Sequence, residues 1–170
     1  MKEYMNTNLS PARRAELLLA ELSLEEKLSQ LICFPPAQKG AYETLERDFP
    51  QGAGHISCLQ MRGLKPLEEG AEFQRGIQDI VLRKSEHHIP AIFHMEGLCG
   101  AYIQGATSFP SGIGRASSWD PALEERVGEI VGRQERAIGV SETLAPVLDI
   151  SRDARMGRQG ETYGEDPALA

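Results

Sequence analysis

Apolar side chains recur at helical spacing near the amino terminus. Ser10 followed by Pro11 is typical of a helix start, with a capping residue and then proline at the first helical position. Ser23 and Glu26 have the spacing of a capping box, which predicts a second helix. We expect this helix to end at Pro35-Pro36 and its apolar stripe to pack in the core; the stripe is Leu24, Leu28, Leu31 and Ile32.

Two more helices are predicted from the same spacing. One follows Pro66 and carries an apolar face of Phe73, Ile77, Ile80 and Val81. The other opens on Asp120-Pro121 and ends near Gly139, and one of its sides carries Leu123, Val127, Ile130, Val131, Gln134 and Ile138. A further Asp-Pro pair, Asp166-Pro167, predicts another helix start close to the last residue.

Short apolar runs between the helices predict buried strands over residues 54–58, 89–93 and 144–150, while residues 37–53 and 101–118 are interpreted as loops. Strands that alternate with helices favour a parallel sheet with crossover helices, the α/β class. About three such βα units are well short of a closed eight-stranded barrel, for which about 250 residues is typical. Because the last helix start is cut short, we expect the chain to be truncated.

The composition narrows the class of protein. The 170 residues are 41% hydrophobic and 25% charged, as is ordinary for a soluble domain with its own core. A net charge of −7 argues against nucleic acid or an anionic membrane as the main partner, and no apolar run could span a bilayer. The first ten residues lack the apolar core of a signal peptide. Three widely spaced cysteines, Cys33, Cys58 and Cys99, favour reduced thiols in a cytoplasmic protein.

Charged residues crowd the segment that follows the last predicted strand. Asp149 ends that strand, and the loop after it carries Arg152, Asp153, Arg155, Arg158, Glu161, Glu165 and Asp166. Charges at the exit of a buried strand are costly unless they are paired or used, and strand ends are where scaffolds present chemistry. Guanidinium groups suit bidentate contacts to carboxylates or to vicinal sugar hydroxyls. The pattern alone favours loop-bracing ion pairs and a binding site about equally.

Glu96 follows the strand predicted over residues 89–93, between His94 and Cys99. Histidine and glutamate at this spacing resemble the zinc deaminase motif, but that motif needs a downstream P-C-x-x-C, which is missing from the sequence. We therefore expect no metal and no other cofactor. Glu96 is better interpreted as a carboxylate that accepts hydrogen bonds from a polar ligand, whereas His55 and His87-His88 are interpreted as structural or surface residues.

The glycines and serines between residues 97 and 118 match no motif with a known mechanism. They form neither G-x-G-x-x-G after a strand nor a P-loop, which argues against nucleotide binding. They also lack the G-x-S-x-G turn of serine hydrolases.

Five segments, in order, resemble the N-terminal domain of glycoside hydrolase family 3, which includes β-glucosidases and β-xylosidases. They are residues 89–97, 105–110, 144–149, 152–158 and 161–167. The resemblance runs from about Ser23 to the end, so we expect a helical lead-in over residues 1–22 and a partial family 3 domain over residues 23–170. It implies the N-terminal portion of a (β/α)8 TIM-like barrel or a variant of one.

The resemblance also implies roles for individual residues. Glu96 corresponds to the carboxylate that hydrogen-bonds hydroxyls of the sugar in the −1 subsite, and Arg158 to the arginine that contacts the same sugar. Asp149 and Glu161 correspond to supporting residues. The chain departs from the family in three places, with Cys99 where histidine is frequent and Ala154 and Met156 where proline and tryptophan are usual.

The catalytic residues that the resemblance implies fall beyond Ala170, so we assign no nucleophile and no acid/base to this chain. Two functions stay open. The chain is the N-terminal fragment of a retaining, β-glucosidase-like hydrolase of terminal non-reducing β-linked sugars, or it is a non-catalytic remnant or partial sugar-binding unit. In both cases the expected partner is a β-linked glucoside, xyloside or oligosaccharide. An open barrel piece would also expose apolar surface and tend to associate.

Overall fold

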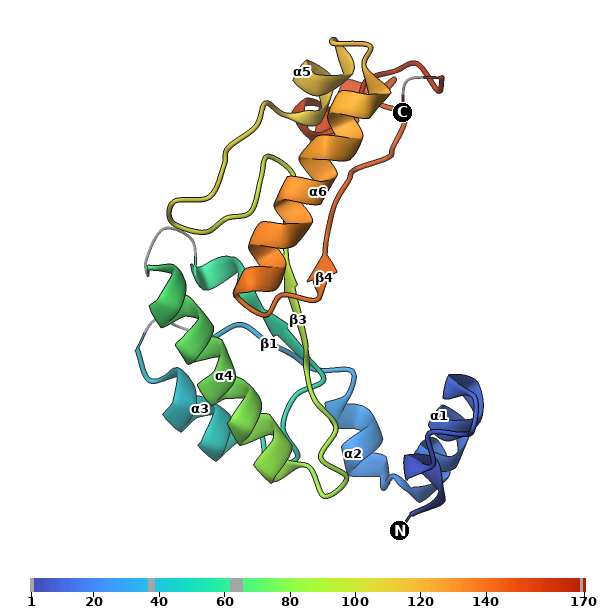
Figure 1. The fold of residues 1–170 in the computed structure, drawn as a ribbon, viewed down its shortest axis with the longest axis vertical. Coiled ribbons are helices and arrows are strands. Elements are labelled where there is room, and N and C mark those ends of the chain that lie inside the picture. Colours follow the sequence, from blue (N-terminus) through green and yellow to red (C-terminus); the bar gives the residue numbers. More distant parts are fainter. Residues whose placement is uncertain (1, 37–38, 62–65, 169) are drawn as a thin grey trace.

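The structure is a computed structural model that describes residues 2–36, 39–61, 66–168 and 170. Its centre is a four-stranded parallel sheet in which the strands follow their order in the sequence, as Figure 1 shows. The strands are β1 (Cys33–Phe34), β2 (His55–Ser57), β3 (Ile92–Met95) and β4 (Glu142–Thr143). The predicted α/β class with a parallel sheet is therefore confirmed.

Helices precede the sheet and connect its strands. The α-helices are α1 (Pro11–Glu21), α2 (Leu24–Ser29), α3 (Ala41–Asp48), α4 (Leu67–Lys84), α5 (Gly112–Ala116) and α6 (Pro121–Ala137). The 3-10 helices are η1 (Glu3–Met5), η2 (Cys58–Met61), η3 (Ala154–Met156) and η4 (Gln159–Glu161). In Figure 1, α3 and α4 lie side by side against the sheet, and α6 runs beside β4. No helix in the described ranges is both long and apolar enough to cross a bilayer.

The core lies between one face of the sheet and helices α3 and α4. Successive side chains of a strand point to opposite faces, so every second residue of β1, β2 and β3 enters this core. The buried set includes Phe34, Ile56, Phe93 and Met95 from the sheet, Leu45 from α3, and Ile77, Ile80 and Val81 from α4. The apolar face predicted for the helix after Pro66 is thus confirmed at its three buried aliphatic positions.

The other face of the sheet is open and concave. Cys33 Sγ on β1 lies 3.3 Å from His94 Nε2 on β3, and His55 Nδ1 on β2 lies 3.8 Å from Glu142 Oε2 on β4. Each contact passes over an intervening strand. In a flat sheet the backbones of such strands are about 9.6 Å apart, so these contacts show that the sheet curves around this face. Such curvature is typical of a barrel wall.

Some sequence-based boundaries were wrong. β1 lies inside the stretch where the second helix was expected to continue to Pro35, and α3 lies within the predicted loop 37–53, of which residues 37 and 38 are outside the described residues. A two-residue strand is too short to show a period, and α3 starts after Gly40, at φ +73°, without a side-chain cap. α5 likewise falls in the predicted loop 101–118, and the strand expected at 89–93 begins at Ile92.

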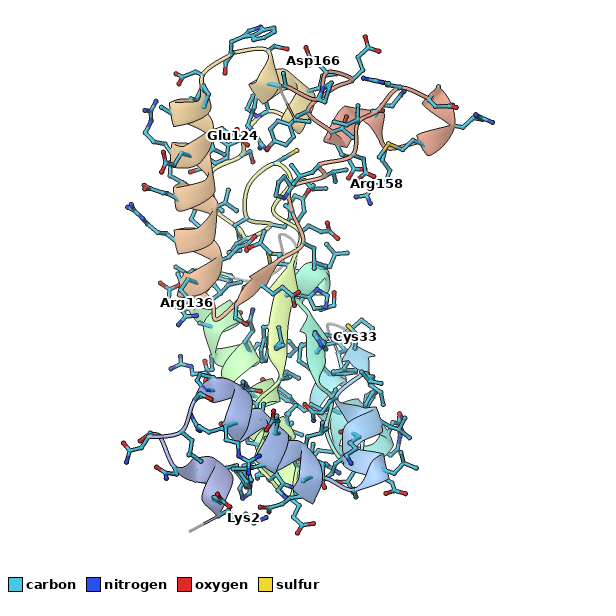
Figure 2. All side chains as sticks on the ribbon, turned by 90° about the vertical axis from the view of Figure 1, so that its right-hand side faces the viewer. Lys2, Cys33, Glu124, Arg136, Arg158 and Asp166 are labelled. Carbon is cyan, nitrogen blue, oxygen red and sulfur yellow. The ribbon has the colours of Figure 1, made fainter. Side chains whose placement is uncertain are left out.

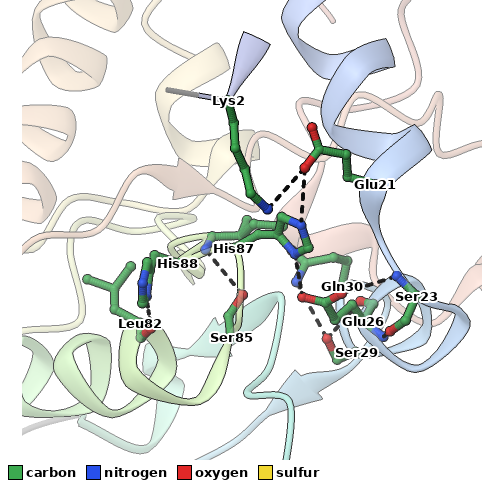
Figure 3. Close-up of polar contacts among 11 residues, drawn as sticks. Lys2, Glu21, Ser23, Glu26, Ser29, Gln30, Leu82, Ser85, His87 and His88 are labelled. Atoms are coloured by element: carbon green, nitrogen blue, oxygen red, sulfur yellow. Dashed lines mark hydrogen bonds and ion pairs between the residues drawn. The ribbon is translucent and has the colours of Figure 1, made fainter. Parts of the chain in front are cut away.

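The apolar stripe predicted for the second helix faces solvent, contrary to the prediction that it packs in the core, and α2 ends at Ser29, before Leu31 and Ile32. Leu24, Leu28, Leu31 and Ile32 are 66%, 54%, 81% and 40% exposed. The helix buries its polar side instead, because the carboxylate of Glu26 has partners there. Glu26 Oε1 lies 2.7 Å from His87 Nδ1, and Glu26 Oε2 accepts a hydrogen bond from the backbone N–H of Ser23 at 3.1 Å, as Figure 3 shows.

This buried pair makes the stability of the fold sensitive to acid. The hydrogen bond from His87 lowers the pKa of Glu26. A carboxylate with a lowered pKa stabilises the fold above its unfolded pKa of about 4.3, and this stabilisation is lost as the pH falls through the folded value. We expect Glu26→Gln to be less stable than the unchanged chain at pH 6, with the difference shrinking below pH 4.

Urea unfolding at both pH values measures this difference. Glu25→Gln is the matched control, because Glu25 is exposed on the same helix. Unfolding is therefore compared at pH 6 and pH 3, and a Glu26→Gln difference of the same size at both would contradict the prediction.

Candidate sugar-binding site

Four residues singled out in the sequence lie on three segments beyond the carboxyl ends of the strands, and they are Glu96, Asp149, and the pair Arg158 and Glu161. Glu96 directly follows β3 and is half-buried, whereas Asp149 lies in the segment after β4 and is exposed. The carboxylates of Glu161, Glu96 and Asp149 all raise the pKa of Arg158, and the hydrogen bond to Glu161 has the largest effect. The fold therefore brings the three carboxylates within electrostatic reach of Arg158.

Arg158 is oriented by a two-pronged contact with Glu161. Its Nε donates to Oε1 at 3.0 Å and its Nη2 donates to Oε2 at 2.6 Å, which is the fork geometry of guanidinium and carboxylate. The same contact lowers the pKa of Glu161. The Arg158 side chain is still 55% exposed, and Figure 2 shows it on the side of the loop that faces the sheet. A fixed but accessible guanidinium is suited to bind a polar ligand.

Glu96 is held between two fixed neighbours. Met95 before it is fully buried, and its carbonyl accepts a hydrogen bond from the backbone N–H of Leu144 at 2.7 Å. Gly97 after it has φ +115°, and a Cβ there would lie 2.4 Å from Thr143 Cγ2. The backbone on both sides of Glu96 is thus determined by the end of β4.

The apolar run 144–150 is not the buried strand that we predicted. β4 ends at Thr143, and Leu144, Leu148 and Ile150 are exposed. Pro146 has no N–H with which to continue the ladder, so the segment leaves the sheet and makes only an isolated bridge between Val147 and Thr162. Asp149 therefore stands in an extended segment and not at a strand end.

The loop that carries Arg158 is anchored by its own following residues. Thr162 is fully buried, and the start of α5 packs so closely that a Cβ on Gly112 would lie 2.8 Å from the Thr162 carbonyl oxygen. The hydroxyl of Tyr163 donates a hydrogen bond to Glu124 on α6. Burial and this hydrogen bond raise the pKa of Tyr163.

Arg115 joins the two halves of the site, and this role was missed in the sequence analysis. Its Nη1 donates to the carbonyl of Leu98 at 2.9 Å, just after Glu96, and its Nη2 donates to Tyr163 Oη at 2.7 Å. Its Nε also lies 2.9 Å from a carboxylate oxygen of Glu124. The residue falls in the segment interpreted as a loop, where no periodicity marks it. A single arginine among glycines and serines was the one available signal.

Some charged residues of this loop form ion pairs with close neighbours in the sequence. Arg155 Nε lies 2.9 and 3.0 Å from the two carboxylate oxygens of Asp153, and both side chains are exposed. Both arginines are therefore paired within the loop, Arg155 with Asp153 and Arg158 with Glu161, and Arg158 also lies within electrostatic reach of Glu96. Among the described residues, no group of three or more histidine, cysteine or acidic side chains is arranged to hold a metal ion.

A cavity of about 750 Å³ lies behind this site, between α6 and the segment after β4. Its walls include Gly128 and Gly132 of α6, Pro146 and Leu148. Neither Glu96 nor Arg158 lines it. Gly97, Arg115 and Tyr163 do line it, so the cavity borders the residues that support the candidate site.

Comparisons with known proteins agree with the fold. The family described as "Glycosyl hydrolase family 3 N terminal domain" matches residues 23–170. The chain is 31% identical over 176 residues to a putative β-xylosidase of Formosa agariphila, covering 99% of this chain and 23% of that protein. It is 30% identical over 172 residues to the periplasmic β-glucosidase of Salmonella typhimurium, covering 98% of this chain and 20% of the relative. The chain thus spans about a fifth of the length of these relatives.

Solved structures of β-glucosidases are also similar to this chain. A β-glucosidase of Erythrobacter marinus superimposes with a TM-score of 0.86 at 32% identity, covering 99% of this chain and 22% of that chain. A mutant β-glucosidase of Listeria innocua in complex with laminaribiose has a TM-score of 0.74 at 24% identity, covers 95% of this chain and 22% of that chain, and shares the fold. The family match extends over most of the sequence, and the chain therefore belongs to glycoside hydrolase family 3, of whose N-terminal barrel domain it forms a part.

Proposed function

We propose that the chain supplies one side of the terminal-sugar subsite of a β-glucosidase-like hydrolase. Glu96 accepts hydrogen bonds from sugar hydroxyls, and Arg158 donates to hydroxyl oxygens of the same ring. The observation that carries this proposal is the convergence of Glu96 and Arg158, which lie far apart in the sequence, at the carboxyl end of the sheet. In barrel enzymes this end of the strands holds the active site.

The two groups complement the chemistry of a sugar ring. An ionised carboxylate only accepts hydrogen bonds and a guanidinium only donates them, whereas each hydroxyl does both. Neighbouring hydroxyls can therefore bridge Glu96 and Arg158. Hydrogen bonds to charged groups contribute about 1.5–3 kcal/mol each. Glu161 and Asp149 support this arrangement by keeping the guanidinium oriented between carboxylates.

For the intact protein we propose hydrolysis of a terminal, non-reducing β-linked sugar with retention. That mechanism needs two carboxyl groups about 5 Å apart across the scissile bond. We assign neither group to a described residue of this chain, and Glu96 is proposed as a sugar ligand only. The names of the relatives, β-xylosidase and β-glucosidase, support the substrate class. A non-catalytic sugar-binding unit would share the binding site and differ in lacking turnover in the intact protein.

The proposed site is tested by titrating the isotopically labelled chain with laminaribiose. We expect weak binding, with a dissociation constant on the order of 1 mM, because only one side of the subsite is present. Amide NMR signals of Glu96 and Gly97 and the Nε signal of Arg158 should shift together. Glu96→Gln should weaken binding, whereas Glu86→Gln, which changes an exposed carboxylate elsewhere, should not. Laminaribiose that leaves all three signals unmoved would exclude the site.

The isolated chain should not hydrolyse 4-nitrophenyl β-glucoside or β-xyloside, because both catalytic carboxyl groups are assigned outside it. Release of nitrophenol is measured by absorbance with a large excess of chain. Turnover by a pure sample that disappears in Glu96→Ala would refute this assignment.

A further inference from the structure

Glu135 is a buried carboxyl group that the proposed sugar contacts do not use. It lies in the last turn of α6, and only 1% of its surface is exposed. One carboxyl oxygen, Oε2, accepts a hydrogen bond from the hydroxyl of Thr143 at the end of β4. The other, Oε1, has no hydrogen-bond partner among the described residues and lies 3.1 Å from the point where a Cβ of Gly97 would stand.

The position of Glu135 connects the two segments that carry the site. Gly97 directly follows Glu96, and Thr143 directly precedes the segment that leads to Asp149. These two residues approach each other so closely that Gly97 has no room for a side chain. The Glu135 carboxyl packs against both of them from behind. Any change in its size or hydration therefore acts on the backbone that holds Glu96.

The surroundings favour the uncharged form of this carboxyl. Burial raises the pKa of Glu135, and the hydroxyl of Thr143 only partly offsets this effect. Glu135 itself acts on a titratable group of another element, Cys58, whose pKa is raised to about 12 mainly by burial, so the thiol is neutral at ordinary pH. Glu26 provides the contrast within the same chain, because it is equally buried but has His87 beside it and a lowered pKa.

We infer that Glu135 is a positioning residue for sugar binding, whose uncharged carboxyl fixes Glu96 through Gly97 and Thr143 and whose ionisation loosens that contact. The inference rests on the proposed function for its effect on affinity, and on the geometry of α6, Gly97 and Thr143 for the contact itself. A carboxylate formed in this place would be left with a single hydroxyl donor, and drawing in water to solvate it would separate α6 from the ends of β3 and β4. Sugar affinity should therefore fall as the pH rises.

The contact is tested without any sugar by NMR titration of the Glu135 side-chain carboxyl carbon between pH 4 and pH 9. We expect its midpoint to lie above the ordinary value of about 4.3. The amide signal of Gly97 should move with the same midpoint, and this movement should be absent from Glu135→Gln. A midpoint at or below the ordinary value, or a Gly97 signal that ignores the titration, would overturn the inference even if laminaribiose binds.

The effect on the site is tested by measuring laminaribiose affinity at pH 5 and pH 9. The unchanged chain should bind about fivefold more weakly at pH 9, a coupling of ordinary size. Glu135→Gln, which keeps the size of the side chain and cannot ionise, should bind equally at both pH values. Glu129→Gln, an exposed substitution on the same helix, should behave like the unchanged chain.

The variants separate this inference from the proposed function. If laminaribiose fails to bind the unchanged chain at any pH, the proposed function fails, while the Gly97 titration still decides whether Glu135 acts on the Glu96 backbone. If laminaribiose binds and Glu135→Gln keeps the full pH dependence of the unchanged chain, the positioning role is refuted and the proposed function stands. Circular dichroism and urea unfolding at both pH values establish that each variant is folded where its affinity is measured.

Discussion

Replacing Gly54 by alanine is expected to destabilise the chain by about 3 kcal/mol, the upper part of the range for overpacked interiors. A Cβ at this position would lie 2.1 Å from the carbonyl oxygen of Gln30 and 2.5 Å from its carbonyl carbon. Both atoms belong to the backbone, so no side-chain rotation can relieve the overlap. Gly54 precedes β2, and Gln30 ends α2, which means that the overlap falls where the first helices meet the sheet.

Hydrogen bonds on both sides prevent the backbone from moving aside. The N–H of Gly54 donates to Ser29 at 2.9 Å, and the carbonyl of Gly54 accepts from the N–H of Ile92 at 2.8 Å. The next residue, His55, donates to Ile32 at 3.0 Å. Shifting Gly54 by the ångström that alanine requires would break contacts to the end of α2, to Ile32 just before β1, and to β3. The loss should therefore be cooperative and reach the whole sheet.

Urea unfolding followed by circular dichroism measures the effect, and Gly128→Ala is the matched control. Gly128 lies inside α6, where a Cβ would meet nothing within 4 Å. Alanine in a helix interior is more favourable than glycine by about 1 kcal/mol, so this variant should be slightly more stable than the unchanged chain. A Gly54→Ala chain within 1 kcal/mol of the unchanged chain would show that the two backbones are not in contact.

Helices with long local patterns could be predicted from the sequence, whereas elements defined by distant contacts could not. α4 and α6 were recognised because their signals are local, namely an apolar period over many turns and, for α6, the Asp120 cap. β1 is two residues long and is defined only by pairing with β2, which no local pattern records. The leucines of α2 were placed in the core because an apolar stripe is usually buried. That rule failed because the polar side of α2 is buried instead, where the charged residue Glu26 pairs with His87, 61 residues away in the sequence.

The candidate site likewise contains residues that the sequence could identify and residues that only the folded chain reveals. Glu96 was interpreted as a ligand-binding carboxylate from its place after a strand, and the sugar-binding roles of Glu96 and Arg158 came from the resemblance to a family. The structure brings the two residues within electrostatic reach of each other without testing those roles. Arg115 and Glu135 support the backbone around these residues through contacts to Leu98, Tyr163, Thr143 and Gly97. Contacts of this kind depend on packing between distant segments, so the spacing of residues along the chain could not reveal them.

Replacing Arg158 by alanine should remove detectable laminaribiose binding while leaving the fold intact. The side chain is more than half exposed and its partner is Glu161 in the same loop, so little packing is lost. Exposed ion pairs contribute little to stability, and the unfolding midpoint should change only slightly. The loss of a charged hydrogen bond to the sugar corresponds to an affinity about 10- to 100-fold weaker. From a starting constant on the order of 1 mM, such a loss is beyond detection by titration.

Arg155→Ala is the control that makes this prediction specific. Arg155 lies in the same loop, carries the same charge, is even more exposed, and pairs with Asp153 as Arg158 pairs with Glu161. The carboxylates of Glu96 and Asp149 act on Arg158, whereas the carboxylate that raises the pKa of Arg155 is Asp153. If the site binds sugar by its general electrostatic field, both variants should weaken binding alike. If it binds through a hydrogen bond from one oriented guanidinium, only Arg158→Ala should do so, and equal losses would refute the assigned contact.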